Sequence, residues 1–364
     1  MREEGKNSVF SPLPAFYKGK RVFLTGHTGF KGAWLTKLLT GFGAQVTGYA
    51  LPPEGEKSLY GLLNPEREMH SVFGDVRDME GLWRAFDGAR PQIVLHLAAQ
   101  PLVRESYQKP RETFEVNVMG TVNLLECARR AGYVRSLVNV TTDKVYENQE
   151  RIWGYREYEP LDGYDPYSNS KSCSELVTHS YTRSFFAGTP TAVSTARAGN
   201  VIGGGDFAAD RILPDCIRAA LSKRPVALRN PGSLRPYQHV LDPLMAYLLI
   251  AFRQYEDASL GGSYNVGPEE RDCVTTGELA TLFCGAWGDG MRWEAVQNQG
   301  PHEANFLKLD CAKLRSAMGW KPRWHIETAV EKTVEWTKVW QAGGDVAACM
   351  DRQAEAFLAG GTEG

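Results

Sequence analysis

Short hydrophobic runs alternate with longer segments of helical spacing along the first two-thirds of the chain. Apolar and β-branched runs predict strands, and apolar positions three and four residues apart predict helices. The predicted strands cover 20–26, 44–51, 69–76, 91–99, 136–142 and 191–201. The predicted helices cover 29–43, 78–87, 111–131 and 166–186. Strands separated by helices indicate βαβ units, and the nearly all-apolar runs at 93–99 and 137–140 fit a parallel sheet covered on both faces.

The pattern changes after about residue 200, where glycine and proline become frequent and the predicted elements become short. We therefore predict an α/β protein with two parts. A doubly wound parallel sheet would occupy residues 17–200. A smaller, mixed α/β C-terminal lobe would occupy 201–345, with some strands returning to the main sheet. Residues 1–16 and 346–364 are predicted to be terminal extensions.

Composition excludes several classes of protein. The hydrophobic fraction of 43%, the charged fraction of 23% and the formal net charge of -2 are ordinary for a globular enzyme and argue against nucleic-acid binding. No apolar run reaches the roughly 18 residues of a membrane helix, and the N-terminus lacks the apolar core of a signal peptide. The 7 cysteines are scattered without a CxxC pair, and the 7 histidines lack metal-site spacing. We expect a cytoplasmic protein with free thiols and no metal.

A glycine-rich turn follows the first predicted strand. The stretch "TGHTGFKG" places Gly26, Gly29 and Gly32 between that strand and a helix, with Thr28, Phe30 and Lys31 among them. Such glycines allow a tight turn and a close approach to a pyrophosphate, which the helix N-terminus attracts. The turn therefore predicts a dinucleotide site.

The second predicted strand lacks the acidic residue that usually binds the ribose 2′-hydroxyl of NAD. Tyr49, Ala50 and Leu51 stand at its end, so this position does not decide between NAD and NADP. Asp75, followed by Val76, lies just after the third strand and is a candidate for contact with the adenine. A helix N-cap or a turn is the alternative role for Asp75.

Tyr167 and Lys171 lie four residues apart in "GYDPYSNSKSCSELV". Pro166 suits the first turn of a helix, on which this spacing brings both side chains to one face. A lysine cation favours the phenolate of a tyrosine, whose usual pKa is about 10. The pair therefore predicts a catalytic tyrosine, and an ordinary surface pair is the alternative.

Several motifs together resemble the extended short-chain dehydrogenase/reductase family over about residues 20 to 340. They are the three glycines, Tyr167-x-x-x-Lys171, Thr142, Asn117, and "HLAAQ" with Leu97, Ala98 and Ala99. The resemblance implies a Rossmann-type N-terminal domain, a bound nicotinamide cofactor (NAD, with NADP as the alternative) and a lobe that binds a nucleotide sugar. It also implies that Thr142, Tyr167 and Lys171 are catalytic and that Asn117 supports them.

Asp143 and Lys144 directly follow the catalytic threonine position. The resemblance implies that an acid and its neighbour at this place serve the nucleotide-sugar 4,6-dehydratases, which need a base at C5 of the sugar and an acid at the C6 oxygen. We expect Asp143 to protonate the leaving hydroxyl and Lys144 to take the C5 proton. For the second role burial must lower the pKa of Lys144, and stabilisation of the enolate by a charged Lys144 is the alternative. A solvated loop end is the non-catalytic interpretation of the pair.

The stretches "TTDKVYEN", "RAGNVIGGGD" and "RPYQHVLDP" are most similar to the members of that family that act on CDP-glucose, which carry lysine where those acting on dTDP-glucose carry glutamate. The resemblance implies a substrate diphosphate near Asn200 and Arg235, with Arg211 and Tyr107 as further substrate-binding candidates, and His302 and Glu303 as minor ones. It also implies a homodimer or homotetramer formed through the two long helices, which we expect to be apolar over much of their surface. Two other functions are a nucleotide-sugar 4-epimerase, which does not need Asp143 and Lys144, and a non-catalytic dinucleotide-binding protein.

Overall fold

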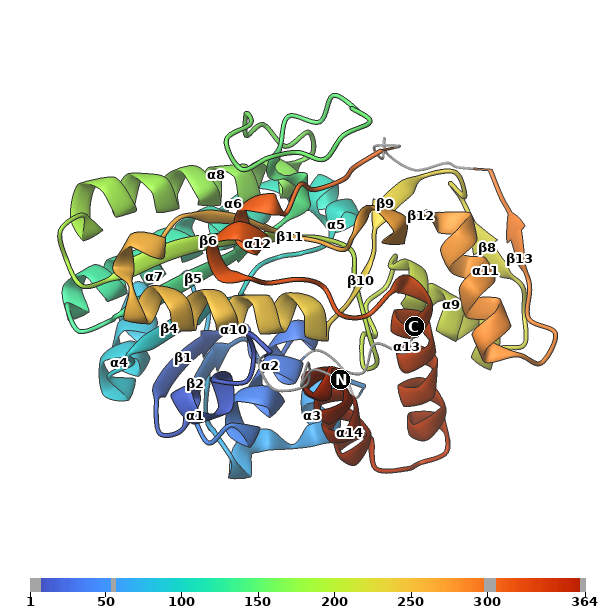
Figure 1. Ribbon diagram of the computed structural model, residues 1–364, viewed down its shortest axis with the longest axis horizontal. Coiled ribbons are helices and arrows are strands. Elements are labelled where there is room, and N and C mark those ends of the chain that lie inside the picture. Colours follow the sequence, from blue (N-terminus) through green and yellow to red (C-terminus); the bar gives the residue numbers. More distant parts are fainter. Residues whose placement is uncertain (1–7, 54–56, 298–305, 361–364) are drawn as a thin grey trace, which may run out of the picture.

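A seven-stranded parallel sheet forms the centre of the protein (Figure 1). The computed structural model describes residues 8–53, 57–297 and 306–360. The strand order is β3-β2-β1-β4-β5-β6-β11, so the sheet runs outward in both directions from β1 and β4. The strands are β1 (Arg21–Thr25), β2 (Gln45–Ala50), β3 (His70–Phe73), β4 (Ile93–His96), β5 (Ser136–Thr141), β6 (Ala192–Ala198) and β11 (Ser263–Val266). The predicted doubly wound α/β fold is confirmed.

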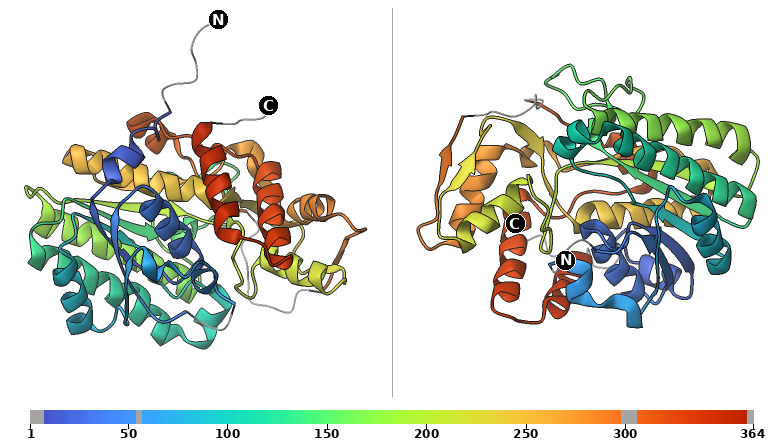
Figure 2. Two further views of the ribbon diagram at one scale, coloured as in Figure 1. Left: turned by 90° about the horizontal axis from the view of Figure 1, so that it is seen from below. Right: turned by 180° about the vertical axis from the view of Figure 1, so that it is seen from behind.

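Helices cover both faces of this sheet, as the left view in Figure 2 shows. One face carries α2 (Phe30–Gly41) and α10 (Leu241–Glu256), and the other carries α4 (Met79–Ala89), α7 (Gly120–Ala131) and α8 (Pro166–Tyr181). Successive strand residues point to opposite faces. In β1, Val22 and Leu24 therefore join the core beneath α2 and α10, while Phe23 joins the core beneath α4 and α7. Because both faces are buried, β1 and β4 are mostly apolar, which explains why the sequence revealed them, whereas β5 and β6 also bury polar side chains, among them Asn139 and Arg197.

A smaller lobe is built from short paired strands and three helices, on the right of Figure 1. Its own core lies among α9, α11 and α13. Its elements are β7 (Val201–Ile202), α9 (Ile212–Leu221), β8 (Val226–Leu228), β9 (Leu234–Pro236), β10 (Gln238–His239), β12 (Cys273–Thr275), α11 (Thr276–Trp287), β13 (Trp293–Ala295) and α13 (Ile326–Gln341). Between β10 and β12 the chain returns to the main sheet to form α10 and β11.

The predicted terminal extensions contribute to the main core. Phe10 and Leu13 near the N-terminus and Phe357 near the C-terminus are buried in the cluster that contains α10. The remaining helices are α1 (Leu13–Tyr17), α3 (Leu59–Leu63), α5 (Val103–Gln108), α6 (Pro110–Phe114), α12 (Ala312–Met318) and α14 (Val346–Ala359). The folded body of the protein therefore extends into both terminal segments.

Three predicted elements differ in detail from the structure. The predicted helix 111–131 is divided into α6 and α7 by a π-helical turn (Glu115–Met119). The predicted strand 191–201 breaks after Ala198, because Asn200 adopts a left-handed conformation with φ 51°. The expectation of an apolar α8 was wrong: its buried face consists largely of hydroxyl-bearing side chains, which are Ser168, Ser170, Ser172, Ser174 and Thr178.

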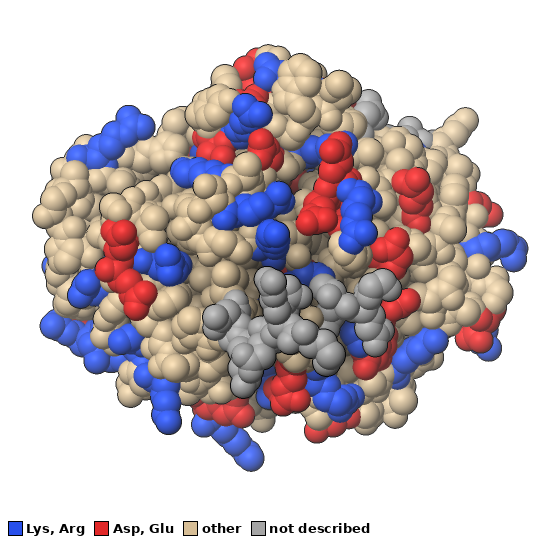
Figure 3. Space-filling model, in the orientation of Figure 1, with Lys and Arg blue, Asp and Glu red and all other residues tan. Residues whose placement is uncertain are grey.

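None of the helices in the described ranges is long and apolar enough to span a bilayer. Figure 3 shows basic and acidic side chains interspersed over one face, in agreement with a net charge of -2.

Helix α2 begins in very close contact with the end of β1. A Cβ atom at Gly32 would lie 2.0 Å from the backbone oxygen of Gly26. A Cβ atom at Gly29, which precedes the helix, would meet the same oxygen at an ordinary 3.5 Å. Only the third glycine of the turn is therefore required by the packing of helix against strand.

We predict that Gly32→Ala destabilises the protein and that the matched variant Gly29→Ala does not. The added methyl group at residue 32 must displace backbone, which costs about 1–3 kcal/mol. Urea denaturation of both variants measures the difference in free energy of unfolding. Equal stability of the two variants would contradict the packing role of Gly32.

Candidate active site

The candidate residues gather at the carboxyl-terminal edge of the sheet. This is where a doubly wound sheet opens a crevice, because the loops leave in opposite directions on either side of the strand-order reversal. The segments that meet there follow β1, β3, β4, β5 and β6, and they are 26–32, 75–76, 97–99, 142–144 and 199–200.

The glycine-rich turn forms a cradle at the end of β1. Gly26 has φ +76°, and a Cβ atom there would lie 2.8 Å from the backbone nitrogen of Ala98. Gly29 is the N-cap of α2, so the N–H groups of the first helical turn open toward the crevice. Burial, and then the charges of Lys171 and Arg211, lower the pKa of Lys31 in this turn to about 7. The turn thus combines open backbone donors with a nearby basic group, which fits a pyrophosphate.

The end of β2 offers no carboxylate to a ribose. Tyr49 donates its hydroxyl hydrogen to the backbone oxygen of Asp75 at 3.2 Å. Thr28 donates to the backbone oxygen of Leu51 at 3.0 Å. Asp75 forms an ion pair with Arg77 at 2.6 Å, which is the main reason that its pKa is lowered. Asp78 caps α4, so an N-cap role of Asp75 was wrong, but the alternative of a turn is confirmed: Asp75 Oδ1 accepts from Arg77 N at 2.8 Å and its backbone oxygen accepts from Asp78 N at 2.9 Å.

Tyr167 and Lys171 lie at the start of α8, which Asp165 caps and Pro166 begins. Lys171 is buried and its Nζ donates to the backbone oxygen of Val140 on β5 at 3.0 Å. Burial lowers the pKa of Lys171 to about 8, and the charge of Glu175 opposes this shift. Lys171 is therefore fixed against the strand that leads to Thr142.

Burial also dominates the environment of Tyr167. It raises the pKa of the phenol to about 12, while a hydrogen bond with Thr142 and the charge of Arg211 act in the opposite direction. The sequence led us to expect that Lys171 would lower this pKa, but in the structure burial outweighs the opposing effects. The contact with Thr142 nevertheless joins the predicted threonine and tyrosine across β5 and α8.

Asp143 and Lys144 begin a short 3-10 helix (Asp143–Val145) at the end of β5. The Asp143 side chain is 0% exposed and accepts hydrogen bonds from three groups: Thr142 Oγ1 at 2.9 Å, Lys144 Nζ at 2.9 Å and Asn200 Nδ2 at 3.0 Å. A solvated loop end is therefore the wrong interpretation for Asp143. The side chain of Lys144 is 28% exposed, so the expected burial of this lysine is only partial and its main partner is the carboxylate.

The substrate-binding candidates differ in the contacts that their side chains make. Arg211 forms a 2.9 Å ion pair with Asp206 and acts electrostatically on Tyr167 and Lys31, so it faces the crevice. Arg235 lies on β9 and donates to the backbone oxygen of Leu234 at 3.0 Å. Tyr107 on α5 is 41% exposed. The minor candidates His302 and Glu303 lie outside the described residues.

Asn117 lies in the π-helical turn and links the loop after β4 to α8. Its Nδ2 donates to the backbone oxygen of Gln100 at 3.1 Å and to Ser170 at 2.9 Å, and its Oδ1 accepts from Gln100 N at 2.8 Å. π-Helical turns often occur at functional sites because they re-orient one side chain. The asparagine therefore holds the loop after β4, directly beyond Leu97–Ala99, in place beside α8.

Sequence reasoning missed residues whose importance depends on contacts between strands. A Cβ atom at Gly199 would lie 2.1 Å from the Asp143 carboxylate, so only glycine leaves room for the buried acid. Asp206 pairs with Arg211, and Glu175 lies one helical turn beyond Lys171. The sequence contains no local signal for Gly199, since its neighbour comes from another strand.

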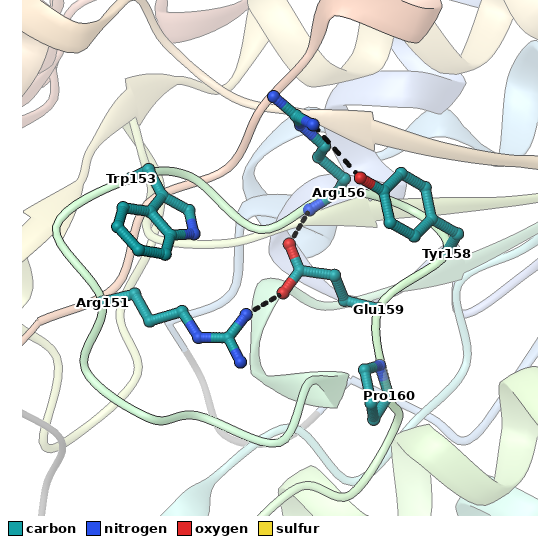
Figure 4. A pocket seen from close by; sticks show the side chains of 6 residues that line it. All are labelled: Arg151, Trp153, Arg156, Tyr158, Glu159 and Pro160. Atoms are coloured by element: carbon teal, nitrogen blue, oxygen red, sulfur yellow. Dashed lines mark hydrogen bonds and ion pairs between the residues drawn. The ribbon is translucent and has the colours of Figure 1, made fainter.

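A pocket of about 420 Å³ lies in the loop between β5 and α8 (Figure 4). Its lining residues are Arg151, Trp153, Arg156, Tyr158, Glu159 and Pro160. Arg151 is already paired with Glu159 at 2.7 Å and Arg156 with Asp310 at 3.0 Å, so the pocket does not present free cations. Among the described residues, no group of His, Cys, Asp and Glu side chains could hold a metal ion.

Comparison with known families fits this geometry. The family described as GDP-mannose 4,6 dehydratase matches residues 23–333. The chain belongs to this family. A curated relative named CDP-glucose 4,6-dehydratase, from Salmonella typhimurium strain LT2, is 45% identical over 353 residues, which are 95% of this chain and 98% of the relative. The predicted resemblance to the 4,6-dehydratases is confirmed.

Two solved structures share the architecture. UDP-glucose 4-epimerase from Thermus thermophilus, solved with NAD, has a TM-score of 0.77 at 29% identity, over 87% of this chain and 99% of the epimerase. dTDP-glucose 4,6-dehydratase from Bacillus anthracis, also solved with NAD, has a TM-score of 0.75 at 21% identity, over 90% of this chain and 100% of the dehydratase. Both an epimerase and a dehydratase therefore use this fold, so the fold does not distinguish the two reactions.

The buried His96, at the end of β4, makes the stability of the protein depend on pH. Its two ring nitrogens are hydrogen-bonded to hydroxyl groups: Nδ1 to Thr25 Oγ1 at 2.7 Å and Nε2 to Thr121 Oγ1 at 3.2 Å. Burial, and then the charge of Lys171, lower its pKa from 6.5 to about 3. Below pH 6.5 the unfolded chain therefore binds a proton at this residue that the folded chain excludes, and stability falls as the pH falls.

We predict that His96→Gln reduces this acid destabilisation. Relative to the parent, the variant should gain about 1.4 kcal/mol for each pH unit below about 6.5. Urea denaturation between pH 7 and 5 measures the difference, with His70→Gln on the exposed strand β3 as the control. Parallel pH profiles for the parent and His96→Gln would exclude a neutral buried His96.

Proposed function

We propose that this protein is a CDP-glucose 4,6-dehydratase, a lyase that converts CDP-D-glucose to CDP-4-dehydro-6-deoxy-D-glucose and water. The observation that carries the proposal is the buried Asp143, held by Thr142, Lys144 and Asn200 at the crevice. An epimerase has no use for this acid. The 45% identity to a relative of that name supports CDP-glucose as the substrate, and the product would enter the synthesis of deoxy and dideoxy sugars of surface polysaccharides.

NAD is the cofactor that we propose, with NADP as the alternative. The glycine cradle at Gly26, Gly29 and Gly32 and the first turn of α2 would hold its pyrophosphate. Asp75, Val76 and the segment 97–99 lie where the rest of the dinucleotide would pass. Bound NAD would supply the acceptor for a hydride from C4 of the sugar and the donor for its return to C6. Because no net cofactor is consumed, we expect it to stay tightly bound.

The first chemical task of the side chains is to remove the proton of the C4 hydroxyl. Tyr167 is proposed as the base, and its hydrogen bond with Thr142 orients the phenol. A positively charged cofactor ring and the ammonium of Lys171 both favour the phenolate, against the burial that raises the pKa of Tyr167. The oxidation at C4 makes the C5 proton acidic, because that carbon is then α to a ketone.

The elimination requires one proton to leave C5 and another to reach the C6 oxygen. In our proposal Lys144 takes the first and Asp143 gives the second. The step would therefore end with a lysine ammonium and an aspartate carboxylate, which is the ion pair seen at 2.9 Å. Transfer of one proton back along this contact restores the starting pair without a change in net charge. The direct contact between the two side chains thus supports a shared proton for the acid and the base.

The substrate diphosphate is proposed to lie between the sheet edge and the smaller lobe. Arg211, which faces the crevice beside Asp206, has the bidentate guanidinium that suits a diphosphate. Asn200 and Arg235 are proposed to contact the same group, and Tyr107 to lie near the sugar. Asn200 would also keep Asp143 in place, since its amide donates to Oδ2.

Two other functions remain as competitors. A nucleotide-sugar 4-epimerase would use Thr142, Tyr167 and Lys171 without Asp143 and Lys144, and it shares the fold. A non-catalytic dinucleotide-binding protein would be expected to have lost one of the three, whereas this chain contains all of them. The buried acid favours the dehydratase over both.

We further propose a homodimer or homotetramer formed through α7 and α8 and their extensions. Met119, Leu176 and Phe185 are each about half exposed on this side of the sheet, which leaves apolar surface for a partner. Light scattering of the purified protein distinguishes monomer, dimer and tetramer. A cytoplasmic location agrees with the 7 cysteines, all of which are free thiols.

Mass spectrometry of CDP-glucose after incubation with the purified protein tests the proposed reaction. We expect the loss of one water from the sugar without added cofactor. If no cofactor has been retained, addition of NAD, and then of NADP, should start the reaction and shows which one is used. Inversion at C4 without a change in mass would establish the epimerase instead, and no turnover of cytidine-, thymidine-, uridine- or guanosine-linked sugars would favour the non-catalytic protein.

We predict that Lys144→Met abolishes removal of the C5 proton. In D2O the parent should place deuterium at C5 of the product, whereas the variant should lose this exchange and about 100-fold or more of its rate. Asp143→Asn should slow the loss of water but still allow C5 exchange. Lys332→Met, on α13 far from the crevice, is the matched control. Unimpaired C5 exchange in Lys144→Met would assign the lysine to enolate stabilisation.

A further inference from the structure

Glu175 is a buried carboxylate that the proposed reaction does not use. Its side chain is 0% exposed, and so is that of its ion-pair partner, Arg197. Burial of two charges is costly, and a hydrophobic pair of the same volume often stabilises a protein equally well or better. A role in positioning would explain why charges lie at this place.

The carboxylate of Glu175 connects three elements of the catalytic centre. Oε1 accepts from Thr141 Oγ1 on β5 and from Arg197 Nε on β6 at 3.0 Å. Oε2 accepts from Thr195 Oγ1 at 2.7 Å and from Arg197 Nη2 at 2.9 Å, both on β6. The two contacts with Arg197 form a bidentate pair. The position of α8 against β5 and β6 is therefore fixed at this carboxylate.

Each of the three elements that Glu175 connects carries a residue of the proposed reaction close to the contact. Thr141 directly precedes Thr142 and Asp143, and β6 leads from Arg197 to Asn200, which binds Asp143. On α8, Glu175 lies one turn after Lys171 and on the same face. The contact therefore sets how Lys171 lies relative to Thr142 and Asp143.

Arg197 extends the connection to the loop after β5 and to β11, the edge strand of the main sheet. Its Nη1 donates to the Tyr146 hydroxyl and to the backbone oxygen of Glu157, each at 2.9 Å. Tyr146 in turn donates to Asn265 on β11 at 2.6 Å. The segment after the catalytic loop is thus held by the same arginine.

The charges around Lys171 make Glu175 important for the ammonium. Lys31 on α2 repels it, His96 on β4 is neutral, and Tyr167 on α8 is protonated because of its raised pKa. Asp143, beyond the end of β5, is already shared by Thr142, Lys144 and Asn200. Burial disfavours the charged lysine, and the charge of Glu175 opposes that effect. The Glu175 carboxylate itself stays ionised, since the charge and hydrogen bonds of Arg197 outweigh its burial and lower its pKa.

We propose that Glu175 is a positioning residue, which holds Lys171 charged and in register with Thr142 and Asp143 through its contacts with Thr141, Thr195 and Arg197. The consequence for catalysis rests on the proposed function. The effect on Lys171 does not, and it can be measured without turnover.

Three variants at Glu175 and one control separate the effects of charge, position and stability. Glu175→Gln removes the charge but leaves Arg197 buried and unpaired, so it is at risk of unfolding. The double variant Glu175→Gln/Arg197→Met removes both charges and avoids this problem. Glu175→Asp keeps the charge on a shorter side chain. Asp272→Asn, which removes a buried carboxylate bonded to His325 and Ile326 in the other lobe, is the control for loss of stability alone.

The first measurement is the titration of Lys171 by NMR of protein labelled with ¹³C at the lysine Cε, with Lys171→Met to assign the signal. In the double variant we expect the pKa of Lys171 to fall by about one unit or more, because the opposing charge has gone. Glu175→Asp and Asp272→Asn should leave it close to that of the parent. An unchanged Lys171 pKa in the folded double variant would overturn the proposal.

The second measurement is turnover of CDP-glucose as a function of pH. We expect the double variant to lose kcat with little change in KM and to lose activity at a lower pH on the alkaline side than the parent. Glu175→Asp should lose kcat without that shift, since only the position of the helix changes. Failure of the parent to dehydrate CDP-glucose would refute the proposed function and leave the NMR result intact. A normal kcat in both variants, with an active parent, would refute the positioning role.

Discussion

A parallel sheet covered by helices on both faces leaves only its edges for chemistry. In this protein the interior positions of β1 and β4 are mostly apolar, and the polar side chains inside β5 and β6, such as Thr195 and Arg197, are bonded to one another or to α8, so polar groups can meet a ligand only where the strands end. The reversal of strand order between β1 and β4 then separates the loops and opens the crevice at one of the two edges. The locations of the glycine-rich turn after β1, of Thr142 and of Asp143 beside it all follow from this one constraint.

Much of this arrangement could be predicted from the sequence, because the strands that carry it are short, apolar and bounded by helices. The strand ends at Gly26, Thr142 and Asn200 were predicted to within a few residues. Contacts between elements could not be predicted. The hydroxyl-rich buried face of α8, the π-helical turn at Asn117 and the requirement for glycine at residue 199 depend on neighbours that are distant in sequence. Periodicity describes one element at a time, so it contains no information about these pairs.

The distinction between reactions in this family is much more local than the fold. An epimerase and a dehydratase superpose on this chain with similar TM-scores. In our proposal, the feature that makes this chain a dehydratase is Asp143, an acid beside Thr142 that is withdrawn from water yet fully hydrogen-bonded. Here three donors compensate for the burial of Asp143, and one of them, Asn200, comes from the next strand. A substitution at the end of β6 can therefore alter the acid at the end of β5.

The path of the chain between the two lobes has a consequence for how such enzymes diversify. Helix α10 and strand β11 come after the first part of the lobe but complete the core and the edge of the main sheet. A cut near residue 200 would therefore remove the cover from one face of the sheet as well as its last strand. The smaller lobe is consequently not a module that recombination can exchange as a block without loss of the main core.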